Sequence, residues 1–175
     1  MGAPFFSIII HSSNTDRYES VHDNLSDHVF WHREAKKNRK LKPKVRNRKK
    51  SNDKFVKVDF EVIIESDIDV AIGKSNADYV IISEDNLVYS EMYLGWMHMF
   101  FTRVTLNFDD VILISPSDPI DTEHPLVSKS FLCSKDDYFK AKELCDDISV
   151  AGLQNKFYDM GYTPFIVPAA GVMNG

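Results

Sequence analysis

The sequence has few cysteines and no long apolar run. Cys133 and Cys145 are the only cysteines among 175 residues, too few for the disulfide framework of a small secreted protein. No apolar run approaches the roughly 18 residues that cross a bilayer, so we expect no membrane span. The apolar N-terminus lacks both a basic stretch before it and a cleavage site, and we interpret it as a strand and not a signal peptide. These absences favour a cytoplasmic protein.

Signature motifs of several enzyme classes are also missing. There is no G-x-G-x-x-G and no G-x-x-x-x-G-K-[ST], which argues against a dinucleotide site of that type and against a P-loop. There is no G-x-S-x-G nucleophile elbow, and neither cysteine has a recognisable nucleophile context. His28 and His32 have the i, i+4 spacing of helical zinc ligands without an H-E-x-x-H context, so we do not predict zinc there.

The charge is distributed unevenly along the chain. The net charge is −5, but residues 33–54 hold twelve Lys and Arg against two acids, which leaves −15 on the remainder. This basic segment has no apolar periodicity and contains Pro43, a composition typical of a flexible loop. Its interior has no aromatic residue to stack on bases, so we do not expect nucleic acid as the main ligand. An auxiliary role in binding phosphates, or a non-catalytic nucleic-acid-binding module that uses this segment, stays open.

Apolar strands alternate with helical patterns along the chain. Strands are predicted at residues 4–10, 55–65, 78–83, 127–133 and 162–167, with one or two more within 104–115. Helices are predicted at about 17–31, 70–75, 91–103, 148–160 and, briefly, from 134. This order predicts an α/β fold with a mostly parallel sheet covered by helices on both faces. At this length, one domain over residues 1–175 is the default expectation, with a surface loop at 116–125.

Residues 78–86 contain the strongest candidate for a site. The apolar run ends in Glu84 and Asp85, and acids at the carboxyl edge of such a strand lie where open α/β sheets bind ligands. Mg²⁺ and Mn²⁺ take carboxylate oxygens, and substrate phosphates commonly complete their coordination. The sequence therefore predicts a metal ion and a nucleotide diphosphate here, and the alternative interpretation is a polar turn after a core strand.

Polar residues follow other predicted strands as well. Asp67 and Asp69 come after the neighbouring strand, where they either accept hydrogen bonds from a nucleoside or form an Asx turn. Asp146 and Asp147 precede the last helix, where they either cap it or act as a general base. Four residues that end the first strand offer donors and acceptors to a nucleoside: His11, Ser12, Ser13 and Asn14.

Taken in order, these segments resemble the GT-A fold of nucleotide-sugar glycosyltransferases, most closely the family 2 type. Residues 6–14 (FSIIIHSSN) are similar to that family's opening strand and turn (FSIIIPTYN), with His11 where proline is usual. Residues 60–67 (FEVIIESD) resemble its second strand, and residues 77–86 (ADYVIISEDN) resemble its metal-binding segment (GDYIxFLDxD). Residues 130–139, 146–147 and 161–162 resemble its later strand, acidic site and Gly-Tyr helix end. The resemblance covers nearly the whole chain.

The resemblance implies an inverting, hexosyltransferase-type enzyme. It would use Mn²⁺ or Mg²⁺ to transfer a sugar from a nucleoside-diphosphate sugar to the hydroxyl of a glycan or another acceptor. It implies metal ligation by Asp85 and Glu84, with Asp146 or Asp147 as the base. It also implies that Asp67, Glu84 and residues 11–14 hold the donor.

The chain departs from the family pattern in three places. The D-x-D motif is degenerate and aligns either as Ser83-Glu84-Asp85 or as Glu84-Asp85-Asn86. Residues 67–78 are shorter than the family's segment, and the chain stops soon after the last strand. These departures predict a compact form, as in some viral enzymes, which would work in the host cytoplasm. A nucleotidyltransferase, which uses strand-edge acids in the same way, is the alternative enzyme class.

Overall fold

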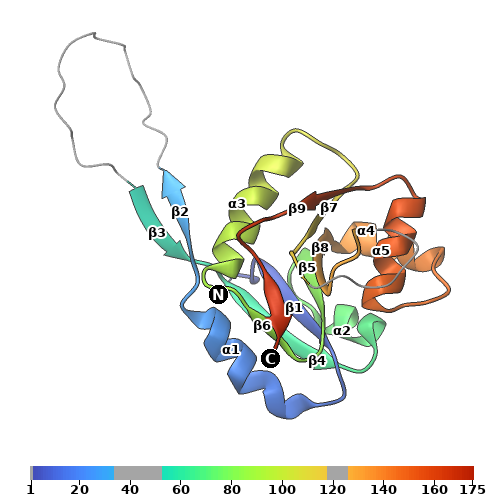
Figure 1. The fold of residues 1–175 in the computed structure, drawn as a ribbon, viewed down its shortest axis with the longest axis horizontal. Coiled ribbons are helices and arrows are strands. Elements are labelled where there is room, and N and C mark those ends of the chain that lie inside the picture. The colour runs from blue at the N-terminus through green and yellow to red at the C-terminus, as the bar shows by residue number, and fades with distance from the viewer. Residues whose placement is uncertain (1, 34–52, 118–125) are drawn as a thin grey trace, which may run out of the picture.

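A mixed six-stranded sheet forms the centre of the molecule. The computed structural model describes residues 2–33, 53–117 and 126–175. The strand order is β4-β1-β5-β8-β7-β9, and only β8 runs antiparallel to its neighbours (Figure 1). The strands are β1 (Phe6–His11), β4 (Phe60–Glu65), β5 (Tyr79–Glu84), β7 (Val111–Ile114), β8 (Ser130–Ser134) and β9 (Thr163–Ile166). The predicted α/β fold with a mostly parallel sheet is confirmed.

Helices cover both faces of this sheet, as predicted. One face packs against α1 (Tyr18–Ser26) and α3 (Tyr93–Thr105), and the other against α2 (Ile68–Lys74), α4 (Lys135–Glu143) and α5 (Val150–Asp159). The alternation of side chains along a strand explains this arrangement, because Ile8 and Ile10 of β1 enter the first core and Ile9 enters the second. A strand buried on both faces needs a continuous apolar run, which is what β1 has.

Two small antiparallel sheets stand outside the central one. β2 (Val29–Arg33) pairs with β3 (Asp53–Lys57), and β6 (Leu87–Tyr89) pairs with β10 (Val172–Asn174). The second pair brings the last residues of the chain beside the segment that follows β5 (Figure 1). A short 3₁₀ helix, η1 (Thr15–Arg17), leads from the end of β1 into α1. No helix in the described ranges has the length and apolarity of a membrane-spanning segment.

The β2–β3 pair corrects the prediction for residues 17–31 and 55–65. The predicted helix ends at Ser26, and residues 29–33 form a strand. Val29, Phe30 and Trp31 are β-branched or aromatic, so they favour a strand once a partner is available. The predicted strand 55–65 splits at Val58 and Asp59 into β3 and β4. Of the predicted basic loop at 33–54, Arg33, Asp53 and Lys54 belong to strands, and residues 34–52 lie outside the described residues.

The prediction of one or two strands within residues 104–115 is confirmed by a single strand. α3 continues to Thr105, so the only strand in this range is Val111–Ile114. Asp110 turns the chain into that strand with a positive φ of 49°, a conformation that aspartate tolerates better than most residues. In the predicted surface loop, residues 118–125 lie outside the described residues.

Candidate functional site

The sheet changes direction between β1 and β5. The chain passes from β1 to β4 on one side of β1 and then returns to β5 on the other side. α1 follows β1 on one face of the sheet, and α2 precedes β5 on the opposite face. In open α/β sheets, this arrangement leaves a crevice outside the carboxyl ends of the two strands, and ligands bind there.

The Ser12 hydroxyl joins the ends of β1 and β5 across this point. Its Oγ donates a hydrogen bond to Asp85 Oδ2 at 2.6 Å and accepts one from the Asn14 backbone N–H at 2.9 Å. The Ser12 N–H donates to the Glu65 carbonyl oxygen at 2.9 Å, which ties the same turn to the end of β4. The ends of three neighbouring strands are therefore fixed relative to one another at the predicted site.

Asp85 is held as a carboxylate. The pKa of Asp85 is lowered, and the largest cause is the hydrogen bond from Ser12. Partial burial acts in the opposite direction and raises the pKa. The Asn86 N–H and the Arg17 guanidinium lower the pKa further. Arg17 Nη1 lies 3.0 Å from Asp85 Oδ1 and also donates to Asn86 Oδ1 at 2.8 Å. Asn86 adopts a positive φ of 60°, which turns its N–H onto Asp85 Oδ1 at 2.7 Å. Asp85 Oδ2 accepts the Ser12 hydrogen bond alone among the described residues and can take another ligand.

Glu84 is the second carboxylate at this strand end. It continues the row of Ile82 on the face of β5 that is covered by α2, α4 and α5. Its N–H donates to the Lys129 carbonyl oxygen at 2.8 Å. Within the described residues, no side chain bonds or pairs with the Glu84 carboxylate. Its neighbour in the register, His11, has Nε2 at hydrogen-bonding distance, 3.1 Å, from the Ser66 carbonyl oxygen.

The donor set at this edge fits a hard divalent cation. Mg²⁺ and Mn²⁺ are commonly held by one or two carboxylates, with phosphates and water completing the coordination. Among the described residues the Glu84 carboxylate has no bonded partner and Asp85 Oδ2 has one, so either carboxylate could supply an oxygen to such an ion. The described ranges contain no cluster of three or more His, Cys, Asp and Glu that could hold a metal by itself. A cation here would therefore depend on substrate phosphates for its remaining ligands.

Asp67 caps a helix. Its Oδ1 accepts hydrogen bonds from the N–H groups of Asp69 at 2.8 Å and Val70 at 3.3 Å, at the start of α2. This is the Asx-turn alternative of the sequence interpretation, and among the described residues Oδ2 accepts no hydrogen bond. Asp69 lies 2.5 Å from the Lys142 ammonium and accepts a hydrogen bond from the Tyr138 hydroxyl at 3.2 Å. The end of α4 therefore lies beside the beginning of α2.

Asp146 and Asp147 follow α4 at this same carboxyl edge of the sheet, and both are exposed. Asp147 Oδ2 accepts a hydrogen bond from Ser149 Oγ at 2.9 Å, and Ser149 in turn caps α5 through the Gly152 N–H. A Cβ atom on Gly152 would lie 2.6 Å from Asp147 Oδ2 and would also collide with the Asp147 carbonyl oxygen. The absence of a side chain at Gly152 therefore lets Asp147 rest on the first turn of the helix.

The structure brings the predicted residues to one edge of the sheet but divides them between two groups. Ser12 and Asp85 are bonded directly, whereas His11 and Glu84, which are paired in the register of β1 and β5, continue the rows of Ile9 and Ile82 on the other face. Asp67, Asp146 and Asp147 lie on the side of α2, α4 and α5. In the described part of the chain, no hydrogen bond or ion pair connects these three acids to Asp85.

Sequence reasoning missed Arg17 and a set of buried hydroxyls beneath the edge. Arg17 lies at the end of η1, and its only sequence signal is a basic residue shortly after the first strand. The buried hydroxyls begin at Ser83, the residue before Glu84, whose Oγ lies 2.8 Å from Ser130 Oγ. The Tyr93 hydroxyl lies 3.0 Å from Ser130 Oγ and accepts a hydrogen bond from Ser115 Oγ at 3.0 Å. These groups are buried and satisfy one another, so they stabilise the edge from below.

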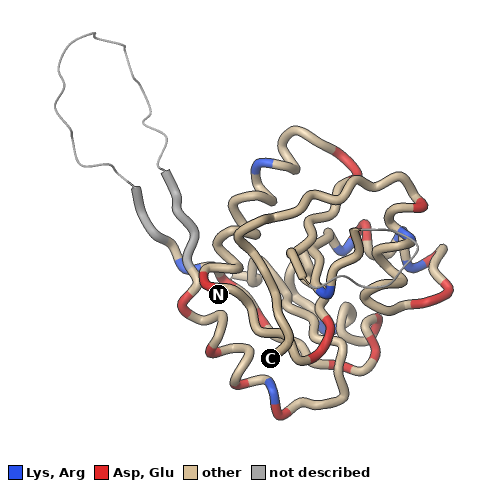
Figure 2. Tube along the Cα trace, in the orientation of Figure 1, with Lys and Arg blue, Asp and Glu red and all other residues tan. Residues whose placement is uncertain are grey.

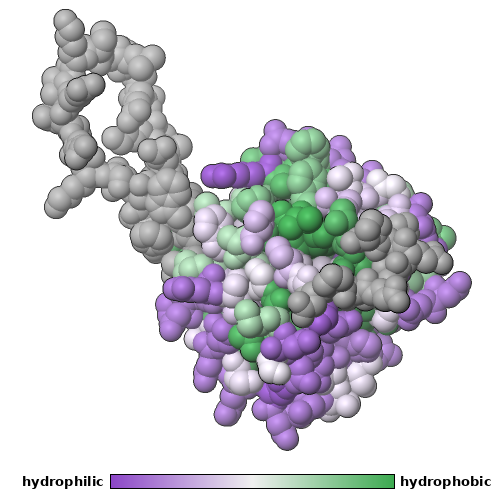
Figure 3. Space-filling view, in the orientation of Figure 1, coloured by the Kyte–Doolittle hydropathy of each residue, from purple (hydrophilic) through white to green (hydrophobic). Residues whose placement is uncertain are grey.

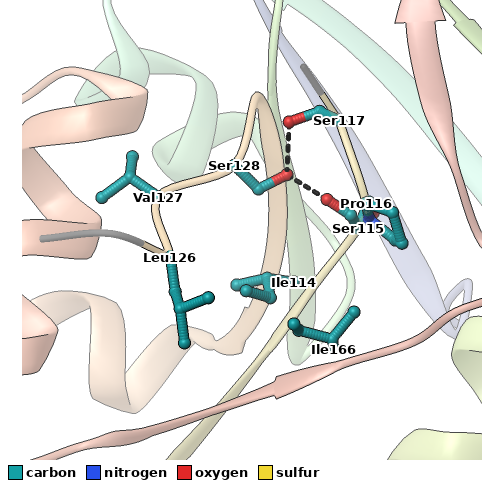
Figure 4. Close-up of a pocket in the computed structure, with 8 residues that line it drawn as sticks. All are labelled: Ile114, Ser115, Pro116, Ser117, Leu126, Val127, Ser128 and Ile166. Carbon is teal, nitrogen blue, oxygen red and sulfur yellow. Dashed lines mark hydrogen bonds between the residues drawn. The ribbon is translucent and has the colours of Figure 1, made fainter. Parts of the chain in front are cut away.

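Two pockets open near this edge. One, of about 240 Å³, lies where β7 ends and β8 begins, and Figure 4 shows the Ser128 hydroxyl between Ser115 and Ser117 on one side of it. Its lining is Ile114, Ser115, Pro116, Ser117, Leu126, Val127, Ser128 and Ile166. The other, of about 270 Å³, lies between α1 and β6 and is lined by Arg17, Ser20, Val21, Asn24, Leu87 and Val88. Arg17 therefore lines a pocket and contacts Asp85 at the same time.

The surface around these pockets is divided by polarity. Acidic residues mark α1 and the loops below the sheet in Figure 2, in keeping with the acidic composition outside the basic segment. The surface around α1 in the lower part of Figure 3 is mostly hydrophilic, whereas apolar side chains gather over β7 and β9.

No protein-family model matches this chain, and the comparison with curated proteins gives no match. The functional assignment therefore depends on the residues and geometry of the site.

Proposed function

We propose that this chain is a metal-dependent glycosyltransferase that moves a sugar from a nucleoside-diphosphate sugar to an acceptor hydroxyl. The observation that carries the proposal is the Ser12–Asp85 hydrogen bond across the switch point between β1 and β5. It holds an ionised carboxylate at the edge where open α/β sheets take nucleotides, one residue after Glu84, whose carboxylate has no bonded partner among the described residues.

Glu84 and Asp85 would hold the Mn²⁺ or Mg²⁺ ion in this proposal. The bound cation would offset the negative charge that develops on the departing diphosphate. Asp85 suits this role because its lowered pKa keeps it ionised at neutral pH. Its hydrogen bonds with Ser12 and Arg17 also fix its orientation before a ligand arrives.

The nucleoside would lie against the turn that follows β1. Ser13 and Asn14 are exposed there, and His11 and Asp67 border the turn from the ends of β1 and β4. Asp67 keeps one carboxylate oxygen outside its helix cap, which is enough to accept a hydrogen bond from a ribose hydroxyl.

Asp146 or Asp147 would act as the base. A new bond forms between the acceptor oxygen and the anomeric carbon while the bond from that carbon to the diphosphate oxygen breaks. The hydroxyl proton passes to the aspartate, and the electron pair of the broken bond stays on the diphosphate. Attack opposite the leaving group inverts the anomeric configuration. The pocket of Ser115, Ser117 and Ser128 is the proposed acceptor side.

The experiment is product analysis with a panel of nucleotide sugars and Mn²⁺. The proposal predicts release of a free nucleoside diphosphate, whereas release of pyrophosphate would favour a nucleotidyltransferase. Asp85→Ala should abolish metal-dependent turnover, and the exposed Asp23→Ala on α1 should not change it. Metal-dependent turnover that survives in Asp85→Ala would remove Asp85 from the metal site.

The role of the base is tested separately with Asp146→Asn and Asp147→Asn. Substitution of the residue that accepts the proton should lower kcat by roughly 100-fold or more, while the KM for the donor changes little. Unchanged kcat in both variants would contradict this assignment without affecting the metal site.

A further inference from the structure

Two cations flank the turn formed by Glu84, Asp85 and Asn86. Arg17 approaches from η1 and donates to the side chains of Asp85 and Asn86. Lys129 approaches from the residue before β8, where its carbonyl oxygen accepts the Glu84 N–H at 2.8 Å. The turn with the two proposed metal ligands therefore contacts the Arg17 side chain and the Lys129 backbone.

The Lys129 ammonium contacts a residue of β10. Lys129 Nζ donates to Asn174 Oδ1 at 3.1 Å. Asn174 is paired with Leu87 in the β6–β10 sheet, and the Gly175 N–H donates to the Asn86 carbonyl oxygen at 2.6 Å. β10 thus holds Lys129 next to the same turn that Arg17 contacts.

Both cations have donors to spare. Arg17 has five N–H groups, of which Nη1 uses two on Asp85 and Asn86, and Nη2 reaches the Leu87 carbonyl oxygen only at 3.5 Å. Lys129 has three N–H groups and uses one on Asn174. In the described residues, no other acceptor is bonded to these groups, so each cation can donate to an anion without giving up its present contacts.

The charges at the turn balance. The carboxylates of Glu84 and Asp85 are offset by Arg17 and Lys129, so the group as a whole is neutral. A divalent cation would leave it with two positive charges, and the diphosphate of a nucleotide sugar carries one negative charge on each phosphate. The four side chains and the metal together would match a diphosphate, whereas the two acids and the metal alone would not.

We propose that Arg17 and Lys129 form a clamp that binds the diphosphate of the donor, with one cation for each phosphate. The inference rests on the proposed function for the identity of the ligand. The clamp chemistry itself would take any diphosphate, so inorganic pyrophosphate serves as a probe that does not depend on the base or the sugar.

The test is calorimetric titration of the full chain with pyrophosphate in the presence of Mg²⁺. Arg17→Gln and Lys129→Gln should each weaken binding by about tenfold or more, the factor expected for one lost charge-assisted hydrogen bond. The controls are Arg103→Gln and Lys140→Gln, which remove exposed cations from α3 and α4. Arg17→Lys keeps the charge and should give an intermediate affinity, which keeps the clamp testable if Arg17→Gln folds poorly.

Equal pyrophosphate affinity in the wild type, Arg17→Gln and Lys129→Gln would overturn the clamp, as would a wild-type chain that does not bind pyrophosphate. A second titration uses uridine, guanosine and their diphosphates. A nucleoside that binds the wild type should bind the variants equally, because the clamp contacts only phosphates. Clamp-dependent pyrophosphate binding without turnover of any nucleotide sugar would support the clamp and reject the glycosyltransferase proposal.

Discussion

Ser12 and Asp85 lie 73 positions apart in the chain, and their side chains meet at 2.6 Å across the ends of β1 and β5. The bond forms only when the two strands are paired in the native register, so assembly of the sheet and assembly of the site are one event. It also sets the electrostatics of the site, because it is the largest influence that lowers the pKa of Asp85.

Ser12→Ala should destabilise the protein in a pH-dependent way. The substitution removes the donor to Asp85 and the acceptor for the Asn14 N–H, and we expect a loss of about 1 kcal/mol in the free energy of unfolding at pH 7. Because the pKa of Asp85 is lower in the folded protein, its contribution is present above the unfolded value, about 4, and is lost as the pH falls.

The measurement is urea unfolding of the wild type and Ser12→Ala at pH 7 and at about pH 3. The wild type should exceed Ser12→Ala in free energy of unfolding by more at pH 7 than at about pH 3. Ser26→Ala, which removes a hydroxyl bonded to the Asp23 carbonyl oxygen, is the control and should show a difference that does not depend on pH. If the loss of unfolding free energy in Ser12→Ala is also the same at both pH values, the coupling to Asp85 is contradicted.

Tyr89 and Tyr93 are neighbouring buried tyrosines with different hydrogen bonding. Burial raises the pKa of Tyr93 to about 12, and its hydroxyl is shared by Ser115 and Ser130. The Tyr89 hydroxyl is buried and has no hydrogen-bond partner of ordinary geometry among the described residues, although Ser83 lies near enough to oppose the rise in its pKa.

Tyr93→Phe should therefore cost about 1 kcal/mol of stability, and Tyr89→Phe should cost close to nothing or stabilise the protein slightly. Thermal unfolding of the two variants side by side checks this, since each loses one oxygen from the same kind of environment. A larger loss in Tyr89→Phe than in Tyr93→Phe would contradict the hydrogen-bond assignment.

Gly152 and Gly73 are a matched pair of helical glycines. Gly152→Ala places a Cβ against Asp147, and we expect a loss of about 1–3 kcal/mol from overpacking. A Cβ at Gly73 in α2 has no atom within 4 Å, so Gly73→Ala should stabilise the protein by about 0.5–1 kcal/mol through helix propensity. Chemical denaturation of both variants measures the two changes in the free energy of unfolding. Equal changes in Gly152→Ala and Gly73→Ala would show that Asp147 does not rest on α5.

The central sheet could be predicted because its signals are local. The apolar run that was predicted as a strand at 78–83 is observed at residues 79–84, and the burial of β1 on both faces follows from its unbroken apolar sequence. The local pattern predicts a helix at Val29, Phe30 and Trp31 because their strand partner lies beyond the basic segment and contributes nothing to that pattern. β6 and β10 have only three residues each, too few for a periodic pattern.

The site was predictable as a set of strand ends but not as a set of contacts. Acids after β5 and β4 are visible in the sequence, whereas the bond from Ser12 to Asp85 and the pairing of Arg17 with Asp85 depend on which strands become neighbours. Lys129 gives no sequence signal at all, because β10 brings its partner Asn174 to the site from the end of the chain. Metal binding and sugar transfer remain predictions.

The central claim is that Glu84 and Asp85 bind a nucleotide sugar together with a divalent metal. Thermal unfolding of the wild type and Asp85→Ala, with a panel of nucleotide sugars in the presence and absence of Mn²⁺, tests it most directly. A nucleotide sugar at 100 times its Kd should add about 2.7 kcal/mol to the free energy of unfolding, which raises Tm by roughly 5–10 °C for a chain of this size. We predict this shift for at least one nucleotide sugar, only with Mn²⁺ and only in the wild type. A shift that is equal without Mn²⁺ or in Asp85→Ala, or no shift with any nucleotide sugar, would contradict the claim.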